Sequence, residues 1–415
     1  MDYDANMRYK FIPMLISGVF LLSACGQKNP APSVETAQPQ IRMTVVQEEI
    51  PRVTSPTGRS FPADVEHINL PGVQHADFDA LVSMLQEMEH LNYVNLGKEK
   101  GTGALTFEDL FLLISDFPEI KFDYTYDVFG KPVSLDDDCL DFNHIQMDDN
   151  GEKLCGVIRT LRSFTYLDAD FTGIDNAVME QLREDYPDAD INWRVWFGMN
   201  YSVRTDVERI IASNPDTDCL TGLDTQVLKY CTKVRFIDIG HNKVDDISFI
   251  ANMPELESAV ICLNEWSDLS PIVNCKKLNY LEINDTACTD LSPLSALTSL
   301  EHLNIGNLRI EKGWEALENL TNLKRLWITS QTYVPPDVLQ SLKVSLPHTV
   351  INTDQASTDL GEWRWLPGGE RNERYEQLFM EMGYYKYGSA LSYYYNDEKY
   401  YPEGYTGSKC MWPKW

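Results

Sequence analysis

The sequence predicts an α/β solenoid, in which short parallel strands stack side by side into one concave sheet. Three observations support this prediction. An apolar pattern repeats about every 22 residues in the second half of the chain, and strand and helix patterns alternate more loosely in the first half. The chain also has 415 residues with 43% hydrophobic content, which is enough for an extended array. A fixed period in this range is typical of units that bury their apolar edges only against their neighbours.

The 22-residue repeat is the strongest signal. It follows the pattern L-x-x-L-x-L-x-x-N-x-L, in which Leu, Ile, Val and Phe replace one another. Repeats begin at Val234, Leu256, Leu278, Leu300 and Leu323, so successive starts are 22, 22, 22 and 23 residues apart. This pattern is identified as a leucine-rich repeat. Each unit is expected to supply one short strand, paired in parallel with its neighbours at ~4.8 Å.

The asparagine of the pattern is present only in the first two of these units. Asn242 and Asn264 lie where the chain leaves the strand. A buried amide there can satisfy backbone groups of the turn and of the adjacent unit. Thr286 and Leu308 replace it in the next two units, so this ladder of hydrogen bonds is expected to lapse toward the carboxyl end.

The convex side is expected to differ between the two halves of the array. Residues 233–354 form the 22-residue units, and these leave no room for helices. Their segments 246–248, 268–271 and 290–293, each of the form Asp-Ile/Leu-Ser, predict short 3₁₀ or extended turns instead. Residues 64–200 form longer units of about 20 to 29 residues, and each is expected to carry a helix on the convex side.

The elements of the longer units follow from apolar spacing. Strand-like cores recur at residues 65–70, 91–96, 120–122, 140–142, 164–167 and 191–195. Helical patterns lie at residues 78–89, 107–117, 153–161 and 176–186. Residues 201–232 interrupt the array and are interpreted as a junction, with helices expected at 207–212 and 225–230.

The amino terminus has the features of a signal peptide, predicted over residues 1–25. Arg8 and Lys10 precede an apolar run, 11–22, which is too short to cross a membrane permanently. The run ends in Leu-Ser-Ala-Cys, which resembles a bacterial lipobox with Cys25 as the lipidated residue. An ordinary secretory signal with a chance cysteine is the alternative. We expect an extracytoplasmic protein anchored to the bacterial cell membrane, with residues 26–63 as a flexible tether.

The charge of the chain restricts its partners. The formal net charge is −28 and the sequence pI is about 4.5. Nucleic acid is excluded as a partner, because its phosphates would repel such a chain. Electrostatic adhesion to anionic lipid is excluded for the same reason, so contact with the membrane is expected only through the amino-terminal lipid.

Nine cysteines are present, and eight remain when Cys25 is set aside. Three of them, at 231, 275 and 288, occupy apolar positions of the repeat, where a free cysteine behaves as a small hydrophobe. We therefore expect mostly buried thiols. Bridges between residues 219 and 231, or between 139 and 155, stay open as alternatives.

The repeat motif also resembles a known family. The 22-residue spacing with N-x-V/W followed by D-I/L-S-P-L/I is similar to the internalin-like leucine-rich repeats of bacterial surface proteins. With the lipobox, the helix-containing early repeats and residues 202–206, the whole chain resembles leucine-rich-repeat lipoproteins of gut Firmicutes. The specific part covers roughly a quarter of the sequence. The resemblance implies a surface-displayed recognition module, and it does not identify the partner.

Strand alternation predicts which residues face outward on the concave sheet. Several of them are aromatic and others are charged or amide side chains, which is the composition of an interface hot spot. We predict that a protein or peptide partner binds there. The predicted contacts are Phe236, Asp238, Val260, Tyr280, Glu282, Asn284, His302, Asn304, Arg325 and Trp327. The alternative is that these residues only make cross-strand contacts.

Residues 355–415 are rich in Trp and Tyr, with Trp363, Trp365, Trp412 and Trp415 framing a tyrosine-dense stretch. A cap over the exposed end of the array, or an ancillary region, is the favoured interpretation. Stacking of these rings on a glycan is the alternative. Glu373, Glu376 and Glu381 are interpreted as charges on the solvated side of one helix.

No catalytic motif is present. The sequence lacks H-E-x-x-H, G-x-S-x-G and G-x-x-x-x-G-K-[ST], and the glycines at 97–103 have the wrong order for a phosphate loop. The acidic segments 136–138 and 148–152 lack the spacing of a calcium loop. We expect a non-enzymatic protein without cofactor or metal. The rival is a glycan-binding or glycan-processing lipoprotein of the cell envelope, with its site in the aromatic C-terminal region.

Overall fold

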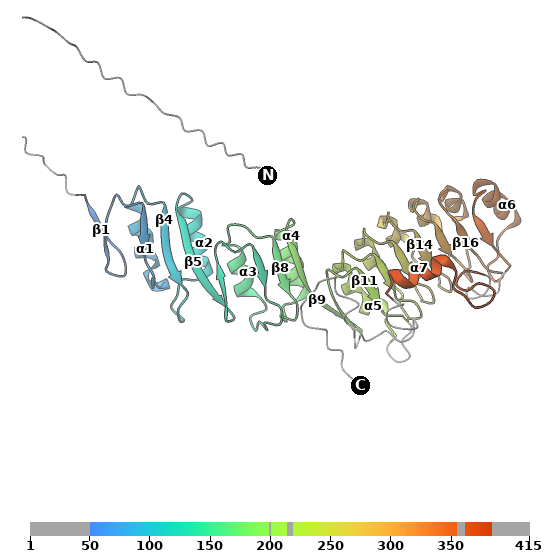
Figure 1. Ribbon diagram of the computed structural model, residues 1–415, viewed down its shortest axis with the longest axis horizontal. Coiled ribbons are helices and arrows are strands. Elements are labelled where there is room, and N and C mark those ends of the chain that lie inside the picture. The colour runs from blue at the N-terminus through green and yellow to red at the C-terminus, as the bar shows by residue number, and fades with distance from the viewer. Residues whose placement is uncertain (1–49, 199–200, 214–218, 355–361, 384–415) are drawn as a thin grey trace, which may run out of the picture. The chain divides into compact units, whose positions relative to one another are not determined.

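The computed structural model describes residues 50–198, 201–213, 219–354 and 362–383 (Figure 1). The predicted signal peptide, Cys25 and the tether up to residue 49 lie outside the described residues. The tyrosine-dense stretch from residue 384 onward also lies outside them. None of the helices in the described ranges is both long and apolar enough to span a bilayer.

A small hairpin precedes the repeats. Strands β1 (Arg52–Thr54) and β2 (Ser60–Pro62) pair antiparallel. Val53 is buried and belongs to the hydrophobic core. The sequence suggested a flexible tether up to residue 63, and its last part is instead ordered by this apolar contact.

The first repeat sheet has the strand order β3-β4-β5-β6. Its strands are β3 (His67–Asn69), β4 (Tyr93–Lys98), β5 (Lys121–Val128) and β6 (Lys131–Ser134). The connections contain η1 (His75–Asp77), α1 (Phe78–Gln86) and α2 (Phe107–Asp116). The first three strands are parallel, whereas β6 returns antiparallel to β5. Both helices lie where the sequence predicts them.

The second repeat sheet has the order β10-β9-β8-β7. Its strands are β7 (Cys139–Asp141), β8 (Tyr166–Ala169), β9 (Asp190–Phe197) and β10 (Tyr201–Arg204). Its helices are α3 (Glu152–Ile158) and α4 (Asn176–Asp185). Strand β10 pairs antiparallel with β9. The expectation of one continuous sheet is therefore wrong, because the hairpins β5–β6 and β9–β10 each end a sheet.

The third repeat sheet is wholly parallel and runs from β11 to β17 in chain order. Its strands are β11 (Arg209–Ile211), β12 (Phe236–Asp238), β13 (Ser258–Val260), β14 (Tyr280–Glu282), β15 (His302–Asn304), β16 (Arg325–Trp327) and β17 (Val350–Asn352). The helix expected at residues 207–212 is wrong. Ile210 pairs with Ile237, and both are fully buried, so this segment forms the first strand of the sheet. The second helix expected in the junction is present as α5 (Gly222–Thr225) and η2 (Gln226–Tyr230).

Short 3₁₀ segments connect the strands of the third sheet, as the 22-residue spacing predicts. They are η3 (Ser248–Asn252), η4 (Ser270–Asn274), η5 (Ser292–Ala296) and η6 (Trp314–Asn319). The last connection is longer and holds α6 (Pro336–Ser345). The inward positions of the strands, such as Ile237, Leu281 and Leu303, are completely buried. The fold is a leucine-rich-repeat solenoid of the α/β class.

A left-handed backbone position recurs at the end of the strands. His241, Leu263, Asp285, Asn307 and Thr329 have φ of 58°, 50°, 56°, 55° and 65°. None of them is glycine, and such a conformation is unfavourable for an L residue unless surrounding contacts hold it. The amides of the first three donate to carbonyls of the next unit, and these bonds supply that support.

The hydrogen bonds expected of the asparagine ladder are formed in the two units that carry an asparagine. Asn264 Nδ2 donates to three carbonyl oxygens and Oδ1 accepts from a backbone amide, and Asn242 does the same one unit earlier. The acceptors of Asn264 are Ile239, Ile261 and Cys262, and its donor is Val244. Thr286 donates one hydrogen bond, to Ile283. The predicted lapse of the ladder is therefore confirmed at this position.

The described cysteines of the repeat lie in the core. Cys231, Cys275 and Cys288 are buried, and burial raises the pKa of the Cys275 thiol to about 12. Cys139 and Cys155 are free thiols and are not bridged to one another.

Candidate functional site

The outward strand positions predicted from alternation line up across the third sheet in columns, here called files. Strand pairing aligns them residue by residue across β12 to β16. The first file is Phe236, Ser258, Tyr280, His302 and Arg325, and the second is Asp238, Val260, Glu282, Asn304 and Trp327. The register expected from the 22-residue period is therefore correct.

These residues do not face solvent. Nine of the ten predicted contact residues are buried, and Arg325 is half-buried. The expectation of an exposed concave surface is wrong because residues 362–383, here called the strap, lie against this face. The strap contains α7 (Glu373–Glu381), which lies in front of the strands of the third sheet (Figure 1). It contacts the concave face, whereas the sequence suggested a cap on the end of the array.

Trp363 is the central apolar contact of the strap. Its side chain is completely buried, and its ring centroid lies 5.6 Å from those of Tyr280 and Trp327. The guanidinium carbon of Arg325 lies 4.5 Å from the centre of the Trp363 ring. The indole Nε1 donates to Oε1 of Glu282 at 3.0 Å. The ring is thus held by aromatic, cation–π and hydrogen-bond contacts at once.

Arg364 supplies the central charge of the strap. Its Nη2 lies 2.5 Å from Oε2 of Glu282, whose side chain is fully buried. The Tyr280 hydroxyl also donates to Glu282. Burial by itself raises the pKa of Glu282, but Arg364 and the donated hydrogen bonds outweigh it and hold that pKa below its ordinary value. Glu282 is therefore ionised and paired at neutral pH.

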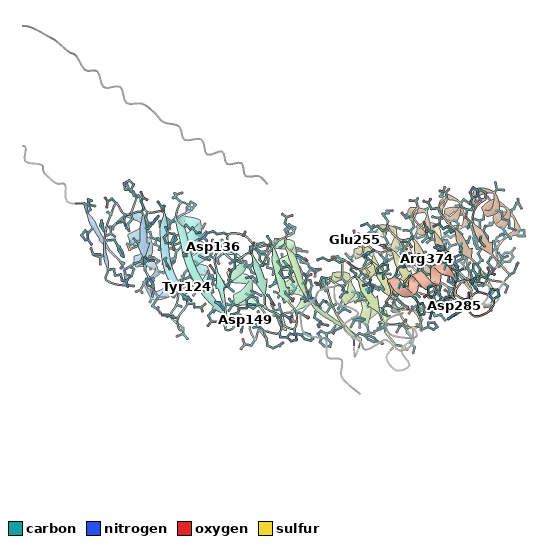
Figure 2. The ribbon with its side chains drawn as sticks, in the orientation of Figure 1. Tyr124, Asp136, Asp149, Glu255, Asp285 and Arg374 are labelled. Carbon is teal, nitrogen blue, oxygen red and sulfur yellow. The ribbon has the colours of Figure 1, made fainter. Side chains whose placement is uncertain are left out.

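Helix α7 continues the contact toward the first strands. Arg374, labelled in Figure 2, donates from Nη2 to Oγ of Ser258 and to Oδ1 of Asn279, both at 3.1 Å. Ser258 Oγ donates to Glu381 at 3.0 Å, and Arg209 Nε donates to the Glu381 carbonyl at 2.6 Å. The interpretation of Glu381 as a solvated charge is wrong, because this carboxylate faces the sheet.

Two further titratable residues of the concave face are shifted by burial. Burial raises the pKa of Asp238 to about 7, although Gly240 N and Ser213 Oγ donate to its carboxylate at 3.0 and 3.1 Å. Burial, followed by the positive charge of Arg325, lowers the pKa of His302 to about 3. His302 is therefore neutral at neutral pH, and its Nδ1 accepts from Arg325 Nε at 3.0 Å.

The polar match between strap and sheet is incomplete. Within the part of the chain that the structure describes, six buried polar atoms of the strap and of the concave side of the sheet have no hydrogen-bond partner. They are Asn284 Oδ1, Asn304 Nδ2, Arg325 Nη2, Trp327 Nε1, Arg371 Nε and Arg374 Nη1. Buried polar groups are usually paired, so this concentration at one contact is unusual.

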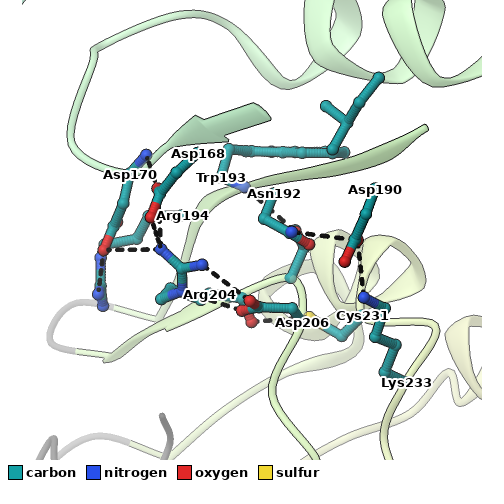
Figure 3. A network of polar contacts seen from close by, with 12 residues as sticks. Asp168, Asp170, Asp190, Asn192, Trp193, Arg194, Arg204, Asp206, Cys231 and Lys233 are labelled. Carbon is teal, nitrogen blue, oxygen red and sulfur yellow. Dashed lines mark hydrogen bonds and ion pairs between the residues drawn. The ribbon is translucent and has the colours of Figure 1, made fainter. Parts of the chain in front are cut away.

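A second buried polar cluster lies on the second sheet (Figure 3). Arg194 donates to both oxygens of Asp170 at 2.7 and 3.0 Å. Arg204 Nη1 lies 2.9 Å from Asp168, and its Nη2 lies 2.8 Å from Asp206. Residues 202–206 were noted in the sequence only as part of a family resemblance, and this ion-pair network was not expected. The sequence carries a signal for it, since charges of opposite sign occupy strand positions between apolar neighbours.

The acidic turns considered for calcium have structural roles. Asp149 accepts from the amides of Gly151 and Lys153 at 2.9 and 3.0 Å, at the start of α3. Asp136 pairs with Arg162. Across the described ranges, no group of three or more His, Cys, Asp and Glu side chains is placed to hold a metal ion.

The aromatic residues considered for glycan stacking are only partly described. Trp363 is buried in the strap contact, so its faces are not available to a sugar. Trp365 is 39% exposed. The remaining aromatic residues of this proposal, from residue 384 onward, lie outside the described residues.

Comparison with known proteins finds likenesses among solved structures only. No family model matches the sequence, and no curated protein matches it. An internalin (InlF) from Listeria monocytogenes is 17% identical, with a TM-score of 0.28, over 66% of this chain and 65% of that chain. An internalin C2 from the same species is 18% identical, with a TM-score of 0.27, over 36% of this chain and 72% of that chain. A leucine-rich-repeat protein from Leptospira interrogans is 15% identical, with a TM-score of 0.31, over 69% of this chain and 75% of that chain. This chain thus spans slightly less than two thirds of the first internalin.

Proposed function

We propose that this protein is a non-enzymatic recognition module that binds a protein or peptide partner through the concave face of β12 to β16. One observation carries the proposal. The face already binds a polypeptide segment, the strap of its own chain, through Trp363 and Arg364. A surface that holds one peptide segment has the shape and the polar groups needed to hold another.

The chemistry of this contact supports the proposal. Protein interfaces concentrate their binding energy in a few buried aromatic and arginine side chains. Tyr280 and Trp327 provide the aromatic walls, and Glu282 provides the carboxylate that an arginine requires. The same side chains were selected from the sequence as partner contacts.

We also propose that the protein is held at the outer surface of the bacterial cell membrane by lipid on Cys25. The apolar run at 11–22 and the residues Leu-Ser-Ala-Cys that end it support this. The net charge of −28 supports a covalent anchor, because anionic headgroups would repel the folded chain. Partition into detergent on phase separation by the intact chain, but not by Cys25→Ala, is the expected result. Partition of both into the aqueous phase would contradict it.

Partner binding is tested by affinity capture from cell-surface extracts. The full chain is compared with Glu282→Lys, which reverses the charge of the concave face. The matched control is Lys277→Glu, a charge reversal at a side chain that is 54% exposed. A protein retained by the unaltered chain and by the control, but lost with Glu282→Lys, is the expected result. Equal capture by all three would contradict the proposal.

A further inference from the structure

The strap points to the chemistry of the partner, given the function proposed above. We infer that residues 362–383 are an internal ligand, and that the partner displaces them by presenting a segment in which an aromatic residue is directly followed by arginine. Trp363 and Arg364 are adjacent in the chain, and both bind the Glu282 carboxylate, one on each oxygen. The concave face thus selects this pair of side chains at successive positions.

Charge complementarity requires a cationic side chain opposite Glu282. Glu282 and Asp238 both lie buried on the same file of the sheet. An ionised carboxylate in such a place is strongly disfavoured unless a cation pairs with it. The strap supplies Arg364 to Glu282 and brings Arg374 against the neighbouring file. A segment with a neutral or acidic side chain at the position of Arg364 would leave Glu282 uncompensated, so the face discriminates against it.

The strap does not use every polar group of the face. Asn284 Oδ1, Asn304 Nδ2 and Trp327 Nε1 are buried and have no hydrogen-bond partner in the described ranges. Asn304 and Trp327 lie in the same file as Glu282, and Asn284 follows Glu282 by two residues, just after the end of β14. An extended peptide has both N–H and C=O groups along its length, and these match the two donors and one acceptor. A partner that forms hydrogen bonds with these three atoms binds the face more tightly than a strap segment of the same length does.

The covalent connection of the strap sets the affinity that a partner has to overcome. The strap belongs to the same chain as the face, so its local concentration there is on the order of millimolar. A free peptide with the strap sequence therefore competes poorly with the intact strap. Weakening the strap without altering the face should expose the full affinity of the site.

The test uses a labelled synthetic peptide of residues 362–383 and fluorescence anisotropy with the full-length chain. Trp363→Ala/Arg364→Ala weakens the strap and leaves the sheet residues unchanged. We expect this variant to bind the peptide at least tenfold more tightly than the unaltered chain does. Adding Glu282→Gln to it should remove the gain. The control is Arg309→Ala, which removes a positive charge from a side chain that is 90% exposed and should leave binding unchanged.

A peptide with alanine at the position of Arg364 should bind the weakened variant at least tenfold less tightly than the native peptide. No gain in the weakened variant, or equal binding of the two peptides, would overturn the inference. Hydrogen exchange on the unaltered chain gives a second measurement that needs no variant. Saturating peptide should accelerate exchange of the amides of α7, and unchanged exchange with the peptide bound would also overturn it.

The outcomes separate this inference from the proposed function. Tight peptide binding by the weakened variant, without any partner captured from cell-surface extracts, contradicts the proposed function alone. Capture of a partner through Glu282, without peptide binding by the weakened variant, contradicts this inference alone.

Discussion

Arg364 Nη2 lies 2.5 Å from Glu282 Oε2, and this ion pair joins the strap to the middle strand of the concave sheet. Glu282→Gln would leave the Arg364 guanidinium without its counter-charge. Removing one partner of a buried pair destabilises a protein by about 3–5 kcal/mol. We expect a loss at the lower end of this range in urea unfolding, because release of the strap would let Arg364 reach water.

The control for this prediction is Glu255→Gln, which breaks an exposed pair with Lys277. Exposed pairs contribute about 0–1 kcal/mol. Equal destabilisation by the two substitutions would show that the Glu282 pair does not hold the strap.

The asparagine ladder predicts a difference in stability between a unit that carries the asparagine and a unit that lacks it. Asn264→Ala removes three donated hydrogen bonds and one accepted bond, and it leaves the Val244 amide without its partner. Each lost hydrogen bond costs about 0.5–1.5 kcal/mol and the unpaired amide about 1–3 kcal/mol, so we expect a total loss of ~3 kcal/mol or more. Thr286→Ala, at the equivalent position one unit later, should cost about 1 kcal/mol. Urea unfolding of the two variants measures the difference, and a larger loss at Thr286 would contradict the prediction.

Gly313 lies where the backbones of two successive units approach each other closely, and a substitution there tests that packing. Its φ is +85°, and a Cβ there would lie 2.3 Å from the backbone nitrogen of Ser292. Gly58 has a similar φ of +78° with nothing within 4 Å of its Cβ position. The backbone strain of alanine, about 1–2 kcal/mol, is common to both positions. We expect Gly313→Ala to lower the melting temperature much more than Gly58→Ala does, and equal shifts would exclude the steric explanation.

The raised pKa of Asp238 predicts how the folding stability of the chain depends on pH. Burial raises its pKa to about 7 in the folded chain, so the folded state keeps a proton that the unfolded state loses at lower pH. The contribution of Asp238 to stability therefore falls as the pH rises from about 4 to about 7. Asp238→Asn keeps an acceptor for the Gly240 amide and removes the titration. Relative to the unaltered chain, the variant should gain about 3 kcal/mol in unfolding free energy between pH 5 and pH 8. A constant difference between the two proteins would contradict this.

The strands and turns of the third sheet could be predicted because their signals are local. The spacing of Ile237 and Ile239 decides which side of the strand is buried, and the fixed period decides the register. A short apolar run is more ambiguous. Residues 207–212 fit a helix as well as a strand, and only pairing with β12 decides in favour of a strand.

Two other features of the fold had weaker signals in the sequence. The hairpin β5–β6 turns at Phe129 and Gly130, with φ of 50° and 82°, which is the turn that two-residue hairpins favour. The glycine was a clue to this turn. Burial of the concave face was harder to predict, because Trp363 and Glu282 lie 81 residues apart and nothing near either residue indicates the other. Their complementary chemistry was the only clue.

The left-handed residues from His241 to Thr329 also limit how this array changes length. Each of the first four follows the last residue of its strand by three positions and donates its amide to the adjoining unit, whereas Thr329 follows its strand by two. The step from β15 to β16 is correspondingly 23 residues instead of 22, so the array accommodates one added residue, and we expect larger changes of length to come as complete units. A longer array is best engineered by duplicating one complete repeat unit, with both ends of the duplicated segment placed at equivalent left-handed positions.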